Sequence, residues 1–561
     1  MANKILTPIT LWNDFDDSLP LNIETDSESE RDGVKYSEIS FSGRAVGSDR
    51  VRIRALLACP AEGGDKPSVL IVPDADKTYD EALAARFVSL GYSVLMPDYR
   101  GRQESAGRYT LYPDSVSYAN FAEAGRRILF ADETAKETAW YEWVAVARYS
   151  LRVLCELKPT KPVGAVGIKA GGDIVWQLAA TAEGLACAVP VCAGGWLAYR
   201  GIKKFGENTE LKMDEERYRF LGGVDAQAYA QHVKCPILML CSTNDSRFDA
   251  DRAFDTFARI APEQEKAFYF SARYDGHIGN TAFKDMELFL DKYLKKYEVF
   301  VPKPIDISIE EEDGALVAKI CFDPNGEVKY CEAFIAEDNF DAATRDWTRC
   351  KHLRDDGDDT AYFALDAYSG AKTVFAFAKA KYSSGFAVSS KIAVKRIDKA
   401  YSNMQPKTRI LFSRLNGTDS FTLDKYDNNV VADCFLDNSI KPIRLVNGPC
   451  GIKGVYSSYG LRSYRLGTER YRPYPGAIIK FDAYAQAPAF LTVTIAVLQE
   501  GKADRYVCGI ALPGGEEWTA CDLSAKDFKN DVGKPLAHFS DGAYITFSSP
   551  NLFCINNFLW L

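Results

Sequence analysis

A run of small residues between a predicted strand and a predicted helix constrains this chain more than any other feature. The run spans residues 164–172, follows a short apolar segment, and leads into residues 173–180, which have the composition of a helix. Glycine accepts backbone conformations and close contacts that other residues do not, so Gly167 and Gly171 permit a strained turn. The sequence therefore predicts a sharp strand–turn–helix unit that lifts the side chain of Lys169 above a sheet.

Apolar strands alternate with helices on both sides of this turn. The expected strands are 68–73, 92–97, 187–192, 236–241 and 266–270, and the expected helices are 79–90, 138–157 and 283–296. Continuous apolar strands separated by helices are typical of a mostly parallel sheet covered on both faces. Ahead of them, residues 36–59 predict an antiparallel pair of edge strands, and the acidic run Glu24–Glu30 is interpreted as a solvated link.

The helical pattern ends at the proline-rich segment 301–304. Short alternating strands with Asp-Gly and Pro-Asn-Gly turns then predict an immunoglobulin-like β-sandwich. The last part of the chain is also all-β, is rich in tyrosine and glycine, and is long enough for a jelly roll. Because 561 residues are too many for one core, we expect three domains, which are residues 1–300, 301–400 and 401–561.

Charge and cysteine usage exclude some classes of function. A formal net charge of −9 argues against nucleic acid or an anionic membrane as the main partner, because both need a basic surface. The fourteen cysteines are scattered, with no Cys-x-x-Cys pair and no metal-like spacing, so we expect free thiols in a reducing compartment and no metal or other cofactor. No signal peptide or membrane-spanning run is evident, which makes a cytoplasmic location the expectation.

Five segments, taken in order, resemble the α/β-hydrolase superfamily in its dienelactone hydrolase and acetyl xylan esterase branches. They are Leu11–Phe15, Leu95–Arg102, the turn at Gly167–Gly171, Ser242–Asp245 and Tyr274–His277. The resemblance covers residues 1–297 and implies an α/β-hydrolase fold whose ancestral activity is ester hydrolysis, on a carbohydrate or a similar small ester.

The resemblance also implies a catalytic triad in the order nucleophile, acid, histidine. Position by position, these roles fall on Lys169, Asp245 and His277, with Asp249 as a weaker substitute for the acid. The resemblance assigns the oxyanion hole to the backbone N–H groups of Ala170 and Ala75. The loop that contains Ala75 is acidic, which suits a developing negative charge poorly.

Lysine at the nucleophile position departs from the family pattern, which has serine in Gly-x-Ser-x-Gly. A lysine that attacked an ester would leave an amide, and an amide hydrolyses too slowly for turnover. Three interpretations of Lys169 remain open. It forms a salt bridge with Asp245 in a disarmed site, it binds a carboxylate or phosphate together with the helix N-terminus, or it acts as a Schiff-base lysine with a lowered pKa.

The C-terminal region resembles galactose-binding-like jelly rolls and carbohydrate-binding modules over residues 405–561. One of its segments is crowded with tyrosine and arginine, and aromatic faces stack on sugar rings while arginine binds hydroxyls and carboxylates. The candidate ligand-binding residues there are Tyr456, Tyr459, Tyr464 and Arg462. The alternative is that these tyrosines pack inside the sandwich or at a domain interface.

Together these features favour an esterase-like protein without the serine nucleophile, an unconventional or inactive member that binds an acidic or acetylated sugar. One alternative is an active carboxylic ester hydrolase in which His277 and Asp245 activate water directly. Another is a scaffold or carbohydrate-binding protein whose pocket is not used. The expected partner is a small molecule or an oligosaccharide, and the sequence gives no oligomeric state.

Overall fold

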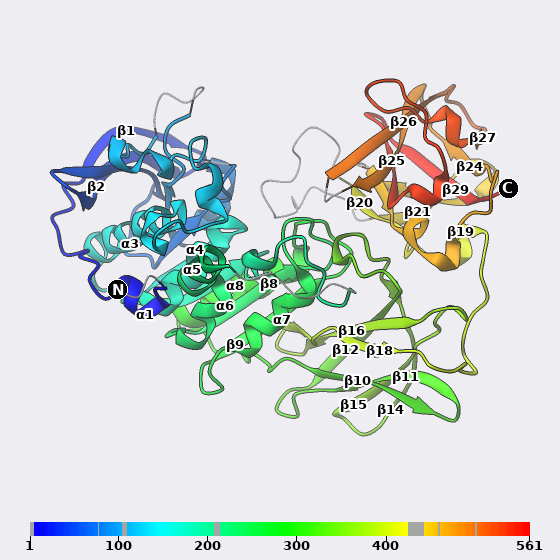
Figure 1. Ribbon diagram of the computed structural model, residues 1–561, viewed down its shortest axis with the longest axis horizontal. Coiled ribbons are helices and arrows are strands. Elements are labelled where there is room, and N and C mark those ends of the chain that lie inside the picture. Colours follow the sequence, from blue (N-terminus) through cyan, green and yellow to red (C-terminus); the bar gives the residue numbers. More distant parts are fainter. Residues whose placement is uncertain are drawn as a thin grey trace.

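The computed structural model describes residues 5–76, 78–103, 109–206, 214–424, 443–457, 460–499 and 502–561. Figure 1 shows the helix-rich N-terminal region on the left and in the centre, a pair of sheets below it on the right, and a second pair of sheets at the upper right. The two ends of the chain lie on opposite sides of the molecule in this view.

The N-terminal region is built on one nine-stranded sheet in the order β1-β2-β3-β5-β4-β6-β7-β8-β9. Its strands are β1 (Glu24–Arg31), β2 (Val34–Val46), β3 (Asp49–Pro60), β4 (Ser68–Val72), β5 (Ser93–Asp98), β6 (Val163–Ile168), β7 (Leu185–Val191), β8 (Ile237–Ser242) and β9 (Lys266–Ser271). β4 to β9 pair in parallel, whereas β1, β2 and β3 pair antiparallel and join the parallel part through β5. The predicted mostly parallel sheet with an antiparallel edge is therefore present.

Helices cover both faces of this sheet. They are α1 (Pro8–Trp12), α2 (Glu81–Ser89), α3 (Ala139–Leu157), α4 (Ala170–Thr181), α5 (Glu215–Gly223), α6 (Ala226–Tyr229), α7 (Ala250–Ala258) and α8 (Asn280–Leu294). Alternate side chains of β4 enter two separate cores. Leu70 and Val72 pack with α3 and α4, and Val69 and Ile71 pack with α2 and α8. Successive strand side chains point to opposite faces, which is why the buried strands read as unbroken apolar runs.

The acidic segment that we interpreted as a solvated link is strand β1, so that interpretation is wrong. β1 pairs with β2 over its whole length, and its side chains are almost all exposed. Cations on the neighbouring strands neutralise its carboxylates, in the pairs Arg52–Glu24, Arg54–Asp26 and Lys35–Glu28. Strand pairing uses the backbone, so an edge strand can have a composition that resembles a loop.

Two smaller sheets follow the prolines. One has the order β10-β11-β15-β14 and the other β13-β12-β16-β17, with β18 also paired to β16. The strands are β10 (Asp306–Glu312), β11 (Ala315–Cys321), β12 (Val328–Glu337), β13 (Thr348–Arg349), β14 (Lys351–Asp355), β15 (Thr360–Ala364), β16 (Thr373–Tyr382), β17 (Ala387–Ser389) and β18 (Ala393–Arg396). We call this part of the chain, residues 306–396, the middle sheets.

The C-terminal region also consists of two antiparallel sheets. Their orders are β21-β22-β29-β24-β27, with β19 paired to β29, and β20-β23-β28-β25-β26. The strands are β19 (Ile410–Phe412), β20 (Thr422–Asp424), β21 (Arg444–Asn447), β22 (Lys453–Ser457), β23 (Gly460–Ser463), β24 (Ile479–Tyr484), β25 (Ala489–Gln499), β26 (Lys502–Leu512), β27 (Thr519–Leu523), β28 (Tyr544–Ser548) and β29 (Phe553–Trp560). We call residues 410–560 the C-terminal sheets. The additional all-β part of the predicted fold class is thus present.

The two all-β regions attach to the rest of the molecule in different ways. Apolar side chains of the middle sheets, such as Phe375 and Phe377, belong to the same core as Phe268 and Phe270 of β9. The C-terminal sheets instead enclose a core of their own. The middle sheets are therefore fused to the N-terminal region by apolar burial, while the C-terminal sheets are joined to it by polar contacts described below.

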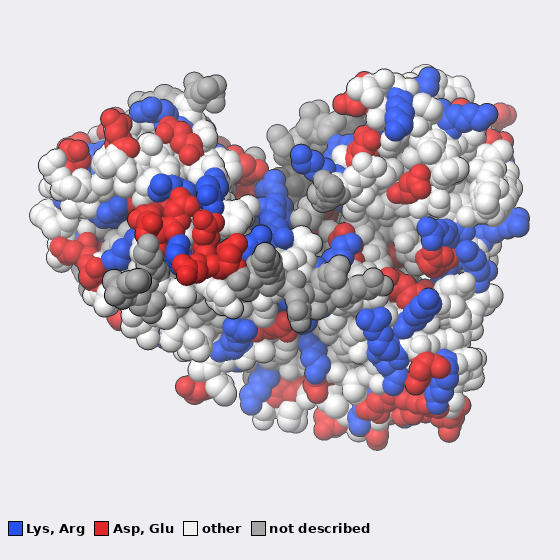
Figure 2. All heavy atoms as spheres, in the orientation of Figure 1, with Lys and Arg blue, Asp and Glu red and all other residues white. Residues whose placement is uncertain are grey.

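Of the helices in the described part of the chain, none has both the length and the apolar composition that a bilayer crossing requires. Figure 2 shows acidic and basic side chains mixed over the visible face, and among the residues drawn in colour no broad basic surface appears on that face.

The glycines of the sharp turn are required by close backbone contact. A Cβ on Gly171 would lie 2.0 Å from the carbonyl oxygen of Val72, and a Cβ on Gly167 would lie 2.2 Å from that of Gly171. These contacts are with backbone atoms, which cannot rotate away. The turn can therefore bring α4 against β4 only with glycine at these positions.

We predict that Gly171→Ala destabilises the protein by about 2 kcal/mol or more, or prevents folding, because α4 must move away from β4. The measurement is the midpoint of thermal or denaturant unfolding. Gly206→Ala is the matched control, since its added Cβ would meet Cβ of Lys203 at 3.3 Å and the carbonyl oxygen of Lys203 at 3.6 Å, both far longer than the contacts at Gly171. Equal stability of the two variants would contradict the prediction.

Candidate active site

Lys169 occupies the strained position of the turn between β6 and α4. Its backbone has φ 52° and ψ −110°, which is a rare conformation for a residue with a side chain. Its N–H donates to the carbonyl of Val191 (2.8 Å), and its carbonyl accepts from the N–H of Asp173 (3.1 Å). The turn therefore has the backbone geometry of a nucleophile elbow, with an amine in place of a hydroxyl.

The elbow lies where the chain reverses its direction across the sheet. β5 pairs with one side of β4 and β6 pairs with the other, so the crevice at the carboxyl ends of β4 and β6 is a topological switch point. Asp74 and Ala75 follow β4, and Lys169 and Ala170 follow β6. Ligands of open α/β sheets bind at such a crevice.

The carboxylate of Asp74 lies between the loop after β4 and the start of α4. Its Oδ1 accepts a hydrogen bond from the N–H of Ala75 (2.8 Å) and a longer one from the N–H of Ala170 (3.4 Å). These are the two backbone donors that the sequence assigned to the oxyanion hole. The structure brings them together, and both point to a carboxylate of the protein itself.

Two cations balance the charge of Asp74. Its Oδ2 lies 3.8 Å from Nζ of Lys169 and accepts a hydrogen bond from Nη1 of Arg247 (3.0 Å). Asp74 is thus one ionic partner of Lys169, and one of the three interpretations named Asp245 as its partner. Lys169 and Asp74 are mostly buried, and the Arg247 side chain is more than half exposed. The site is therefore a nearly closed anion position with cations on two sides.

Asp245 lies in the loop after β8 and is 4% exposed. Its Oδ1 accepts hydrogen bonds from the N–H groups of Arg247 (2.8 Å) and Phe248 (3.3 Å), and among the described residues no hydrogen-bond partner is found for its buried Oδ2. Burial, followed by the negative charge of Asp275, raises the pKa of Asp245 to about 6, although the Lys169 charge acts in the opposite direction.

His277 lies in the loop between β9 and α8 and is 3% exposed. The same loop lies close to the acid, because a Cβ built on Gly276 would lie 3.5 Å from Oδ2 of Asp245. Tyr274 packs nearby, with 6.3 Å between its ring centroid and that of His277. The triad positions Lys169, Asp245 and His277 thus follow the carboxyl ends of the parallel strands β6, β8 and β9. Asp249, the weaker substitute, instead caps α7 and pairs with Arg252 (2.9 Å).

The candidate sugar-binding residues that the structure describes, Tyr456, Tyr464 and Arg462, do not form one surface. Tyr456 is on β22 and half-buried, with the guanidinium of Arg444 5.5 Å from its ring centroid. Tyr464 follows β23 in the opposite sheet, is 2% exposed, and accepts a hydrogen bond from Arg462. Tyr459 lies outside the described residues. A role for these residues in binding sugar stays a prediction.

Sequence reasoning missed two features of this site. It noted that the loop after β4 is acidic, but the direction of the Asp74 carboxylate depends on the contact between that loop and α4. It also passed over Arg247, whose only signal in the sequence is its place two residues after Asp245. Arg247 approaches Asp74 because the loop after β8 folds back toward β4, which adjacency in the chain does not reveal.

Comparisons with known proteins concern the fold of the N-terminal region. Residues 53–268 match the model of the Dienelactone hydrolase family, which is less than half of the chain. The comparison with curated proteins found no match. The match and the observed strand order show that the N-terminal region has an esterase-like α/β-hydrolase fold.

Several solved esterases are similar to the same region at low identity. Acetyl xylan esterase 1 from Thermoanaerobacterium sp. JW/SL YS485 is 17% identical, over 53% of this chain and 96% of that chain, with a TM-score of 0.40. Acetyl xylan esterase from Paenibacillus sp. R4 is 16% identical, over 51% and 92%, with a TM-score of 0.39. A cold-adapted esterase from an Arctic intertidal metagenomic library is 17% identical, over 49% and 100%, with a TM-score of 0.34.

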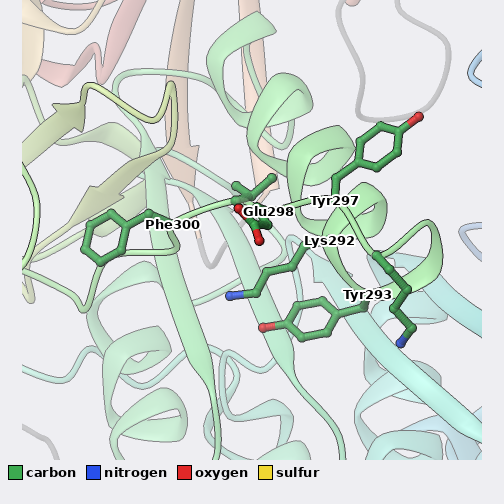
Figure 3. A pocket seen from close by; sticks show the side chains of 7 residues that line it. Lys292, Tyr293, Tyr297, Glu298 and Phe300 are labelled. Carbon is green, nitrogen blue, oxygen red and sulfur yellow. The ribbon is translucent and has the colours of Figure 1, made fainter.

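A separate open pocket of about 520 Å³ lies at the C-terminal end of α8, lined by residues between 292 and 300. Figure 3 shows that Tyr297 and Phe300 point away from each other. Within the described ranges, no three His, Cys, Asp or Glu side chains are grouped so that they could hold a metal ion.

The raised pKa of Asp245 predicts how stability depends on pH. A carboxyl whose pKa is raised on folding stabilises the folded state at low pH, and this contribution is lost as the pH rises through about 6. Asp245→Asn cannot ionise and keeps an oxygen for the N–H groups of Arg247 and Phe248. We therefore expect the variant to gain stability relative to wild type between pH 4.5 and 7.5, by up to about 2 kcal/mol.

Unfolding midpoints at the two pH values measure this effect. Asp76→Asn is the matched control, because its half-exposed carboxylate lies 4.0 Å from Arg247 in the same part of the surface. If the unfolding midpoint of Asp245→Asn differs from that of wild type by the same amount at both pH values, the prediction is contradicted and Asp245 ionises normally.

Proposed function

We propose that this protein is an unconventional esterase-like α/β-hydrolase that binds a small acidic or acetylated sugar at the elbow and forms no acyl-enzyme there. One observation carries the proposal. The two N–H groups that would stabilise an oxyanion are taken by the carboxylate of Asp74.

Two physical reasons oppose acyl transfer at this site. The amine of Lys169 would form an amide instead of a cleavable ester. The carboxylate of Asp74 would also repel the negative charge that develops on a tetrahedral intermediate, where an active esterase presents only donors. Either reason alone reduces turnover, and this chain has both.

The charges around Asp74 favour an acidic ligand. A ligand carboxylate that replaced the Asp74 side chain could accept from Ala75 and Ala170 and still lie between Lys169 and Arg247. One anion would be exchanged for another, so no cation would lose its partner. An acetyl carbonyl could use the two N–H groups but not balance the cations. A uronic acid therefore fits better than an acetylated neutral sugar, and the sugar itself is suggested by the resemblance to carbohydrate esterases.

We predict that Asp74→Ala binds uronates at least tenfold more tightly than wild type, because the internal competitor is removed and both cations stay in place. Calorimetric titration with glucuronate and galacturonate, with glucose as the neutral comparison, measures the effect. Asp76→Ala is the matched control, because it removes the same charge from the same loop without touching the two N–H groups. Equal affinities of Asp74→Ala and Asp76→Ala, or no preference for uronates over glucose, would count against the proposal.

A second candidate function is ester hydrolysis by water that His277 and Asp245 activate. It is favoured by the burial of both side chains on adjoining loops at the elbow end of the sheet. The test is turnover of p-nitrophenyl acetate. If the wild-type protein hydrolyses this ester and His277→Ala abolishes the activity, this candidate is supported and the first is refuted.

The position of Asp74 predicts what is needed to restore acyl transfer. Lys169→Ser alone should give little hydrolysis of p-nitrophenyl acetate, because Asp74 still takes both N–H groups. The double variant Lys169→Ser/Asp74→Ala should be roughly 100-fold faster than Lys169→Ser, which is the usual effect of an oxyanion-hole donor. Adding His277→Ala should remove that gain. A single Lys169→Ser variant as active as the double variant would mean that Asp74 leaves the hole readily.

A further inference from the structure

Two loops carry the acid and the histidine of the candidate site. We call residues 243–251 the acid loop and residues 272–279 the histidine loop. They are hydrogen bonded to each other, since the N–H of Arg273 donates to Oγ1 of Thr243 (2.7 Å) and the N–H of Asn244 donates to the carbonyl of Tyr274 (3.2 Å). Each loop is also contacted by a different all-β region.

The middle sheets contact the acid loop through Arg345. Its guanidinium forms a two-pronged pair with Asp251, with Nη1–Oδ1 at 2.6 Å and Nη2–Oδ2 at 2.9 Å, and both side chains are at most 2% exposed. The backbone beside it is engaged as well, because Nδ2 of Asn244 donates to the carbonyl of Arg345 (2.8 Å). Asn244 precedes Asp245 directly. The middle sheets therefore fix both ends of the acid loop.

The C-terminal sheets contact the histidine loop through β20 and β23. Arg462 of β23 donates from Nη1 to Oδ2 of Asp275 (2.7 Å) and from Nε to Oδ1 of Asp424 (2.9 Å). Oγ1 of Thr422 donates to the carbonyl of Arg273 (2.7 Å). Thr422 and Arg462 are directly opposite each other in the β20–β23 pair, so one strand pair holds the loop from both sides.

The Arg462 pair is well placed to act on the site. The side chain of Arg462 is 11% exposed. Its guanidinium lies 4.6 Å from the centroid of the Tyr544 ring, and this contact restricts its orientation. Asp275 is two residues from His277, and its negative charge is felt by Asp245. Arg462 thus neutralises Asp275, an acid that is close to His277 in the chain and whose charge acts on Asp245. It also holds the histidine loop.

We infer that the two all-β regions are built-in supports of the candidate site, with Arg345 as the positioning residue of the acid loop and Arg462 as that of the histidine loop. This is a different role from that of an appended binding module, which would leave the loops unchanged when its contacts are removed. The inference concerns the position of the loops and does not depend on which ligand the site binds.

Hydrogen exchange of the full chain, read by mass spectrometry, tests the inference without any ligand. In Arg462→Met, amide exchange in residues 272–279 should be at least tenfold faster than in wild type, with residues 243–251 changed less than threefold. In the double variant Arg345→Met/Asp251→Asn the pattern should reverse. Both partners are replaced there because a single change would leave a buried charge and could prevent folding.

Matched control variants distinguish the loss of a loop's position from a general loss of stability. Arg354→Met removes a similar two-pronged pair, with Glu312, on the exposed surface of the middle sheets. Arg444→Met removes an exposed arginine of the C-terminal sheets. Neither should alter exchange in either loop. Arg462→Lys keeps the charge and should restore most of the protection that Arg462→Met loses.

The side-chain NMR signal of His277 gives a second readout. The chain has four histidines, so His277→Gln assigns the signal. This signal should shift in Arg462→Met and keep its wild-type position in Arg444→Met. Unchanged exchange in both loops, or equal acceleration of both loops in each variant, would overturn the inference. Because no ligand is used, a failure here is distinct from a failure of uronate binding.

Discussion

The candidate site depends on one interaction, the capture of the Asp74 carboxylate by the N–H groups of Ala75 and Ala170. The two groups belong to loops after adjacent parallel strands, so the carboxylate joins β4 to the start of α4. Lys169 and Arg247 then have a partner without any ligand. A buried charge is tolerated when it is paired and hydrogen bonded, and Asp74 meets both conditions. The fold of the N-terminal region is esterase-like, and at its elbow one carboxylate lies between two cations.

The strained elbow and its glycines are compatible with a lysine at the central position of the turn. The backbone at Lys169 keeps the sharp turn, and Gly171 keeps the close contact with β4. Asp245 and His277 remain buried on the neighbouring loops. The turn requires small residues around its central side chain and places no such demand on that side chain itself.

The all-β regions are attached by two kinds of contact with different consequences. Apolar burial joins the middle sheets to β9, which favours a permanent attachment. The C-terminal sheets have a separate core and reach the histidine loop through Arg462 and Thr422. Polar contacts lose strength quickly when their geometry changes, so the position of the C-terminal sheets bears directly on the position of His277.

The sequence by itself determined the mostly parallel sheet, the helices on both faces, the turn at Lys169 and the all-β character of the second half, since these depend on local hydrophobic period and on glycine. It failed at Glu24–Glu30, where strand pairing by the backbone overrides an acidic composition. Only the tertiary structure decided that Asp74 takes the two N–H groups, that Arg247 reaches it, and that Arg345 and Arg462 hold the two loops. Apart from the bond between Asp74 and the adjacent N–H of Ala75, each of these contacts joins groups far apart in the chain, and no local pattern specifies them.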